Sequence, residues 1–265
     1  MTAVPEDRSA WTLGDWEHRV CADSAQPMPR FAVAELDGLD APVRRHLVRA
    51  IALGAPLAQC GRVSMRGSIK LGRWLPFRAR QVLNPHVGFI WAARVAGVIA
   101  GSDQYLDGTG GMNWKLGGLL TVAHVEGPDV SRSAAGRGGA EAIWLPTALL
   151  PRYGVRWSAQ DDSHVTAHHQ IDGTALDVRL TLDHDGAIQS VVFDRWGDPD
   201  QTGQWAWHPF GGEITGQRTF GGLTIPSSGR LGWHYGTDRW SEGEFFRYEI
   251  TGLRPLPDAD PSEGR

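Results

Sequence analysis

The sequence predicts a mainly β (α+β) protein: a single curved antiparallel sheet, or half-barrel, that carries two or three helices. Apolar and polar residues alternate at period two in many short runs, which is typical of strands. The 265-residue chain holds 34 glycines, and glycine-containing turn signals recur along most of it. Two of these signals, Asp172-Gly173 and Asp185-Gly186, are favoured two-residue hairpin turns.

Two helices are expected before the strands begin. Residues 12–20 suit a short helix, with Thr12 as its cap and Asp15 in its first turn. The stretch 42–53 is a clearer helix, because a proline suits its first turn, apolar residues share one face and a Gly-Ala-Pro sequence ends it. From residue 57 the period changes to two, and strand-like runs follow at 63–71, 76–83, 87–95, 98–106 and 111–124.

A helical insertion is predicted in the middle of the chain. Residues 128–138 are polar and rich in glycine, so they are expected to form a loop that leads into a helix at 137–150. The sheet should hold about eight to eleven strands, in one meander that this insertion interrupts once. The later strand-like runs lie at 153–158, 163–171, 174–182, 187–195, 213–220, 223–225, 229–236 and 244–251.

No internal repeat and no break in composition requires two domains. We expect a partly helical N-terminal extension over 1–37, the sheet domain over 38–254, and a disordered tail over 255–265.

Composition excludes several classes of partner and site. The formal charge of −4, with scattered Arg and Lys, argues against a nucleic-acid partner. No dinucleotide or Walker fingerprint is present, so no cofactor is expected. No metal is expected either: on a strand His164 and His168 would lie about 13 Å apart, too far to share one zinc ion.

The predicted location is the cytoplasm. No segment approaches the roughly 18–20 continuous apolar residues of a membrane span, and the N-terminus lacks the apolar stretch of a signal peptide. We therefore expect no membrane insertion. Cys21 and Cys60 are too few for a disulfide framework or a zinc site, and they are predicted to be free thiols in a reducing compartment.

Glu141 is the most informative single residue. It opens the run EAIWLPTALLP at 141–151, an apolar and helix-prone segment with one carboxylate. Burial penalises the charged form of a carboxylate, so this side chain needs a partner or a chemical role. Two interpretations stay open: a structural ion pair, with Arg94 or Arg195 as the partner, or an acid that contacts ligand or catalyses.

Asp103 and Tyr105 join Glu141 as candidate catalytic residues. They lie two residues apart and so share one face of a strand. If one of the carboxylates faces a tryptophan-lined cavity, its pKa should rise and it can act as a general acid or base.

Twelve tryptophans make the composition unusual, and some of them are expected to line an internal cavity, since the indole ring offers a large apolar face with one donor. Several of five tryptophans are predicted on its wall, together with two arginines and a tyrosine as ligand-binding candidates. These residues are Trp91, Trp114, Trp144, Trp205, Trp233, Arg94, Arg195 and Tyr235.

Several motifs together resemble those of a bacterial family of unknown function, DUF6544. The resemblance covers about residues 38–252, and its most specific element is the run at 141–151. It implies a curved antiparallel sheet that holds helices, similar to the half-barrels of lipoprotein-carrier proteins and associated with apolar ligands. The other motifs are PVRR at 42–45, WLPF at 74–77, GFIWAAR at 88–94, DQYLDGTGGM at 103–112, and Trp157.

The chain departs from the family pattern in three places. Many relatives carry an N-terminal membrane anchor, which is missing here, so a membrane role is not expected. Gly138, Gly139 and Ala140 replace bulkier residues before the glutamate, and Trp196 replaces a tyrosine after Arg195. These changes either enlarge a pocket or alter the packing.

Two functions are expected to compete. The first is binding of an apolar small molecule in the concavity of the sheet. The alternative is a cofactor-independent cyclase, isomerase or dehydratase that uses the same cavity; a purely structural or protein-interaction role is the third and least favoured. A carboxylate aimed unpaired into the cavity would favour catalysis, and its absence would favour binding. The oligomeric state is left open.

Overall fold

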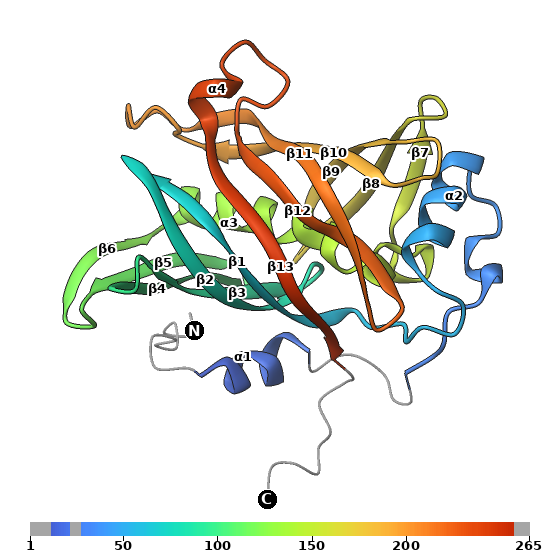
Figure 1. Ribbon diagram of the computed structural model, residues 1–265, viewed down its shortest axis with the longest axis horizontal. Coiled ribbons are helices and arrows are strands. Elements are labelled where there is room, and N and C mark those ends of the chain that lie inside the picture. Colours follow the sequence, from blue (N-terminus) through green and yellow to red (C-terminus); the bar gives the residue numbers. More distant parts are fainter. Residues whose placement is uncertain (1–11, 22–27, 257–265) are drawn as a thin grey trace, which may run out of the picture.

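The computed structural model of the chain describes residues 12–21 and 28–256. The strands in this part of the chain form one 13-stranded antiparallel sheet, which is strongly curved and does not close (Figure 1). The predicted fold class is confirmed, although the sheet has more strands than the roughly eight to eleven expected.

The first six strands precede helix α3 (Pro128–Ala140) in the chain, and the other seven follow it. The first six are β1 (Cys60–Leu71), β2 (Arg73–Asn84), β3 (Gly88–Val95), β4 (Ile99–Leu106), β5 (Thr109–Leu116) and β6 (Leu120–Glu126). The others are β7 (Arg156–Ala159), β8 (His164–Ile171), β9 (Thr174–Leu182), β10 (Ile188–Gly197), β11 (Ala206–Phe220), β12 (Leu223–Trp233) and β13 (Glu244–Leu256).

The expected single meander is in fact two meanders. They join in the middle of the sheet, where the first strand of the chain pairs with the last. The spatial order is β6-β5-β4-β3-β2-β1-β13-β12-β11-β10-β9-β8-β7. The first and last strands pair along their length, from Cys60 opposite Leu256 to Ile69 opposite Phe246. Figure 1 shows this β1–β13 pair crossing the middle of the sheet. The sequence gives no sign of this pairing, because its partners lie almost 200 residues apart.

Helix α3 lies on the inner face of the sheet, whereas α1 (Leu13–Val20) packs on the outer face, against Val82 and Ile90. Helix α1 has the predicted cap, with a reciprocal pair of hydrogen bonds between Thr12 and Asp15. Helix α2 (Ala41–Ala50) ends three residues earlier than expected, because Ile51 turns extended and bridges to Leu223. The remaining helices are α3 (Pro128–Ala140) and the short α4 (Trp240–Gly243).

The prediction of a loop at 128–138 is wrong, because these residues form helix α3. Its glycines let the helix lie close to the sheet: a Cβ at Gly138 would come within 2.7 Å of the Phe89 ring, and one at Gly139 would come within 2.7 Å of Leu176. These two glycines therefore serve packing, and neither lies on the cavity wall described below.

The helix expected at 137–150 is mostly a chain of short 3₁₀ turns. Prolines 146 and 151 start new turns, since proline cannot continue an α-helix. These turns are η3 (Glu141–Trp144), η4 (Pro146–Leu149) and η5 (Pro151–Tyr153), and a further one, η2 (Val33–Leu36), precedes α2.

Two strand predictions also need correction. The run expected at 111–124 is the hairpin of β5 and β6, which turns at Gly117 and Gly118, where φ is +62° and +77°. The runs at 223–225 and 229–236 belong to one strand, β12. The tail predicted as disordered contributes Pro255 and Leu256 to β13, and the rest of that prediction lies outside the described residues.

Cys21 and Cys60 form a disulfide, so the prediction of free thiols is wrong. The bond joins the end of α1 to the start of β1, and the two Cα atoms lie 5.5 Å apart. Helix α1 packs on β2 and β3, which brings Cys21 to Cys60 across 39 residues of sequence. No cysteine spacing could show this contact.

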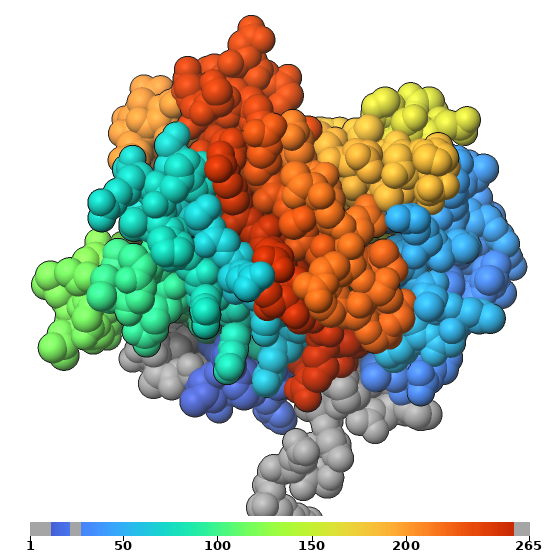
Figure 2. Space-filling model, in the orientation of Figure 1, coloured from blue at the N-terminus to red at the C-terminus, as the bar shows by residue number. Residues whose placement is uncertain are grey.

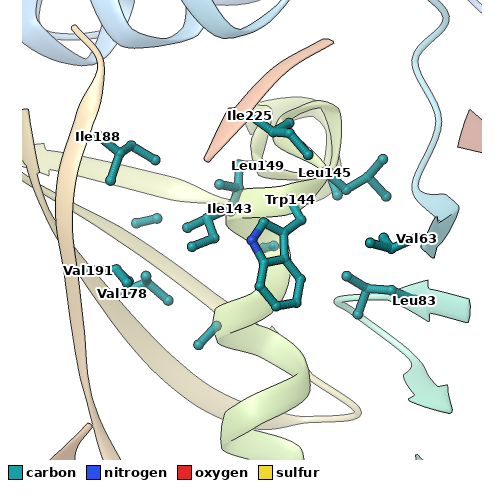
Figure 3. Packing of buried hydrophobic residues seen from close by; sticks show 14 of the residues in the cluster. Val63, Leu83, Ile143, Trp144, Leu145, Leu149, Val178, Ile188, Val191 and Ile225 are labelled. Carbon is teal, nitrogen blue, oxygen red and sulfur yellow. The ribbon is translucent and has the colours of Figure 1, made fainter. Parts of the chain in front are cut away.

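The core fills one part of the concave side. Figure 3 shows Ile143, Trp144, Leu145 and Leu149 of the 3₁₀ turns packed among aliphatic side chains from several strands. From outside, β1, β2, β12 and β13 form much of the opposite face (Figure 2), with a hollow where β1, β2 and β13 meet. Among the described residues, no helix has the length and apolar character needed to cross a membrane.

One buried histidine predicts an acid-sensitive fold. Burial beside Gly139, followed in importance by the nearby His86, lowers the pKa of His169 to about 4. Between about pH 6.5 and pH 4 the unfolded chain therefore binds a proton that the folded chain refuses, so stability falls as the pH falls. We expect this residue alone to remove about 2 kcal/mol of the free energy of unfolding between pH 7.5 and pH 5.

Urea unfolding at both pH values measures this loss. His169→Asn should reduce the pH dependence, whereas His184→Asn, at a fully solvated turn, should leave it as in the wild type. His46 is buried as well, and its pKa is lowered by burial, so part of the dependence should survive in both variants. An unchanged pH dependence in His169→Asn would contradict the assignment.

Candidate functional site

A cavity of about 780 Å³ lies between the inner face of the sheet and α3. This volume falls in the range of roughly 300–1,000 Å³ that is typical of small-molecule sites. The concave side is therefore only partly filled by side chains. Most of the wall is apolar, and its aromatic members are Phe89, Trp91, Trp114, Trp144, Phe193, Trp205, Phe210, Trp233, Phe245 and Phe246.

The pleat of the strands directs the tryptophans inward. On β3, residues 89, 91, 93 and 95 face the cavity side in alternation, and Trp91 packs against Trp114 of β5 with ring centroids 5.8 Å apart. On the other meander, Trp233 lies against Gly197, where a Cβ would come within 2.2 Å of the indole. All five tryptophans proposed from the sequence thus lie around this one cavity.

Arg137 of α3 joins the two carboxylates that the sequence singled out. Its Nη1 lies 2.7 Å from Oδ2 of Asp103, and its Nε lies 2.9 Å from Oε1 of Glu141. The three side chains are 11% to 18% exposed. The guanidinium carbon also lies over Phe89 and Trp91, 5.1 and 5.2 Å from the ring centroids. Burial alone would lower the pKa of Arg137, but the two carboxylates raise it above its usual value.

The remaining carboxylate oxygens have donors too. Trp114 donates its indole N–H to Oδ1 of Asp103 at 2.9 Å, and Gln81, fully buried on β2, donates its amide to Oε2 of Glu141. Each of the four oxygens thus accepts a hydrogen bond from the protein, and both carboxylates share Arg137 as their partner. This arrangement is that of a structural cluster, in which protein donors occupy the carboxylate oxygens.

Arg195 of β10 is the second cation of the cavity and is held differently. Its Nε donates to the hydroxyl and the carbonyl of Ser133 on α3, at 3.2 and 3.3 Å. Its guanidinium carbon lies 4.7 Å from the ring centroid of Phe210 and 5.0 Å from that of Trp233. Burial, followed by the nearby charge of Arg137, lowers the pKa of Arg195 to about 9, so the group stays charged at neutral pH.

Three other predicted site residues lie away from the cavity wall. Arg94 is exposed on the outer face, where its Nη1 donates to the carbonyl of Gly97 at 3.2 Å. Tyr105 is buried, and its hydroxyl donates to Asp172 at 3.3 Å; burial, then the charge of Asp172, raises its pKa to about 12. Tyr235 packs on Trp240 in the loop after β12.

The partner predicted for Glu141 is therefore corrected. Neither Arg94 nor Arg195 pairs with it; Arg137 does. The pairing of Arg137 with Glu141 could have been predicted from the sequence, because residues four apart on a helix lie on the same face. Gln81 follows from the inward alternation of Phe77, Ala79 and Leu83 on β2. The sequence does not point to Ser133, because the glycine-rich residues 128–138 predict a loop.

The described residues hold no group of three or more His, Cys, Asp or Glu side chains placed to bind a metal ion. Trp196, the other departure noted in the sequence, lies outside the cavity and donates to Asp129 at the start of α3, at 2.7 Å. It therefore anchors the helix and leaves the wall unchanged.

Comparison with known proteins gives a family and two distant structural likenesses. The profile of a family of unknown function, DUF6544, matches residues 29–245. No curated protein matches the sequence. A domain from Vibrio parahaemolyticus described as an outer membrane lipoprotein-sorting protein aligns at 9% identity with a TM-score of 0.38, over 77% of this chain and 88% of that one. A LolA superfamily protein from Nitrosomonas europaea aligns at 8% identity with a TM-score of 0.40, over 82% and 94%. Both likenesses are too distant to define a fold or a ligand for this chain.

Proposed function

The chain belongs to DUF6544, and because that family brings no activity with it we propose a function from the site itself: binding of an apolar small molecule in the concavity of the curved sheet. The observation that carries this proposal is the cavity of about 780 Å³ with its aromatic wall. Protein interiors are normally close-packed, and a void forfeits the contacts its lining could make. A bound apolar molecule supplies those contacts.

The geometry favours binding over the catalytic alternative. A general acid or base has to present a free oxygen or proton to its substrate. The oxygens of Asp103 and Glu141 instead accept hydrogen bonds from Arg137, Trp114 and Gln81. Tyr105, the third candidate, lies off the cavity wall. Because the protein engages the oxygens of both carboxylates, the geometry supports binding of a molecule over its chemical conversion.

A neutral apolar dye tests this proposal without knowledge of the natural ligand. We expect N-phenyl-1-naphthylamine to bind the purified protein with a rise in fluorescence and a stoichiometry of about one, as for a single preformed pocket. Leu231→Trp should weaken binding at least tenfold, because Leu231 lies on the cavity wall and the larger ring fills part of the space. The measurement is a fluorescence titration with excitation of the dye.

Leu53→Trp is the matched control. Leu53 is 77% exposed beyond the end of α2, so the same chemical change there should leave dye binding as in the wild type. Circular dichroism checks that both variants fold. No saturable dye binding by the wild type, or equal binding by the two variants, would contradict the proposal.

A further inference from the structure

We propose that the ligand of the cavity is an amphipathic acid, with its hydrocarbon part against the aromatic wall and its carboxylate on Arg195. This inference rests on the proposed function and adds the chemical class of the ligand. It starts from a contrast between the two arginines of the cavity: Arg137 binds two carboxylates, and Arg195 binds none among the described residues.

The free donors of Arg195 are its two terminal amino groups. Only Nε is engaged, by Ser133, and no described residue accepts a hydrogen bond from Nη1 or Nη2. Asp198 also lies on the wall, but its oxygens accept hydrogen bonds from Thr202 and Gly203 at the turn. The protein thus leaves the Nη1 and Nη2 groups of Arg195 free to donate into a mostly apolar space, and we call these two groups the two-donor edge of Arg195.

The rings around Arg195 fix this edge in place. Phe210 and Trp233 lie at 4.7 and 5.0 Å from its guanidinium carbon, and Ser133 anchors Nε. A guanidinium held in this way is preorganised for bidentate pairing with a planar carboxylate. A ligand cation would be repelled, and a neutral hydroxyl would form a weaker hydrogen bond that is not charge-assisted.

The neighbouring cluster selects a single negative charge. Asp103, Glu141 and Arg137 together carry one net negative charge, and both carboxylates are close enough to act on Arg195. The two carboxylates do not offset the desolvation of the Arg195 guanidinium, because the pKa of Arg195 stays below its usual value. A monoanionic carboxylate fits this balance, whereas the second charge of a phosphate monoester would be repelled by the two acids.

Displacement of bound N-phenyl-1-naphthylamine by matched ligand pairs tests the inference. The pairs are hexadecanoic acid with hexadecan-1-ol, and retinoic acid with retinol. All four are used at pH 7.5 and below the concentrations at which they aggregate in water. With wild-type protein we expect at least one acid to displace the dye at about 10- to 100-fold lower concentration than its alcohol. Arg195→Gln should abolish this preference, so that the acid and the alcohol of each pair displace the dye at similar concentrations.

Arg94→Gln is the matched control, because Arg94 is an exposed arginine on the outer face; it should keep the full preference. Arg195→Lys keeps the charge without the two-donor edge and should show an intermediate preference. Equal potency of acid and alcohol in both pairs, with the dye still bound, would overturn the carboxylate assignment and leave the proposed function standing. The comparison within the wild type needs no variant to fold. Absence of dye binding would overturn the proposed function itself.

Discussion

Arg137→Met is expected to lower the free energy of unfolding by about 3–5 kcal/mol. The substitution keeps most of the side-chain volume but leaves Asp103 and Glu141 without their counter-ion, at 17% and 11% exposure. An unpaired charge at such a site costs far more than the pair itself contributes, because the desolvation of the carboxylates is no longer offset. Urea or thermal unfolding monitored by circular dichroism measures the loss.

The carboxylate variants separate a structural role from a chemical one. Glu141→Gln should lower the free energy of unfolding by only about 1–3 kcal/mol, because Arg137 keeps Asp103 as its partner. The triple variant Asp103→Asn, Arg137→Met, Glu141→Gln removes every charge of the cluster and should recover much of the stability that Arg137→Met loses.

The decisive quantity in this series is the difference between the loss of stability in the triple variant and the sum of the losses in the single variants. Changes in the free energy of unfolding add for independent sites but not for residues of one network. A wild-type-like midpoint in Glu141→Gln would remove the structural explanation for this carboxylate. It would then make Glu141 the first residue to test in an assay for catalysis.

The fold class could be predicted because its signals are local. Period-two alternation and turns such as Asp172-Gly173 lie within a few residues, and the structure has β8 and β9 on either side of that turn. The pairing of β1 with β13 could not be predicted, because it depends on contacts between the two ends of the domain.

Helix α3 could not be predicted for a different reason. Glycines are poor helix formers in isolation, so the glycine-rich residues 128–138 suggested a loop. In the folded chain the glycines at the end of α3 permit its close approach to Phe89 and Leu176, and this packing outweighs the local propensity.

The candidate site was predicted in its components more than in its arrangement. The apolar setting of Glu141 indicated a carboxylate with either a partner or a chemical role, and the excess of tryptophan indicated an aromatic cavity. The structure places both at one site and pairs Glu141 with Arg137. The roles of the individual residues in binding stay predictions. Arg94 was misplaced because alternation on β3 puts it on the face opposite Trp91, a distinction that its apolar neighbours in the sequence concealed.

Reduction of the Cys21–Cys60 disulfide is expected to lower the free energy of unfolding by about 4 kcal/mol, from the loop closed by 39 residues of separation. The bond restricts the unfolded chain and ties α1, with buried Trp16 and Val20, to the sheet. Thermal unfolding with and without dithiothreitol measures the effect. The double variant Cys21→Ala, Cys60→Ala should unfold like the reduced protein and should not respond to dithiothreitol, which controls for effects of the reductant elsewhere.

The same bond offers a test of the predicted cytoplasmic location, which had relied in part on free thiols. Cytosolic thioredoxin and glutathione keep most thiols reduced, whereas disulfides persist in oxidising compartments. Rapid alkylation of the host cells before lysis, followed by mass spectrometry, counts the thiols that were free in place. Two alkylated cysteines would agree with the cytoplasm and would mean that the chain works there without its link to α1. An intact disulfide would reject that location, and would mean that α1 is held on the sheet wherever the protein meets its ligand.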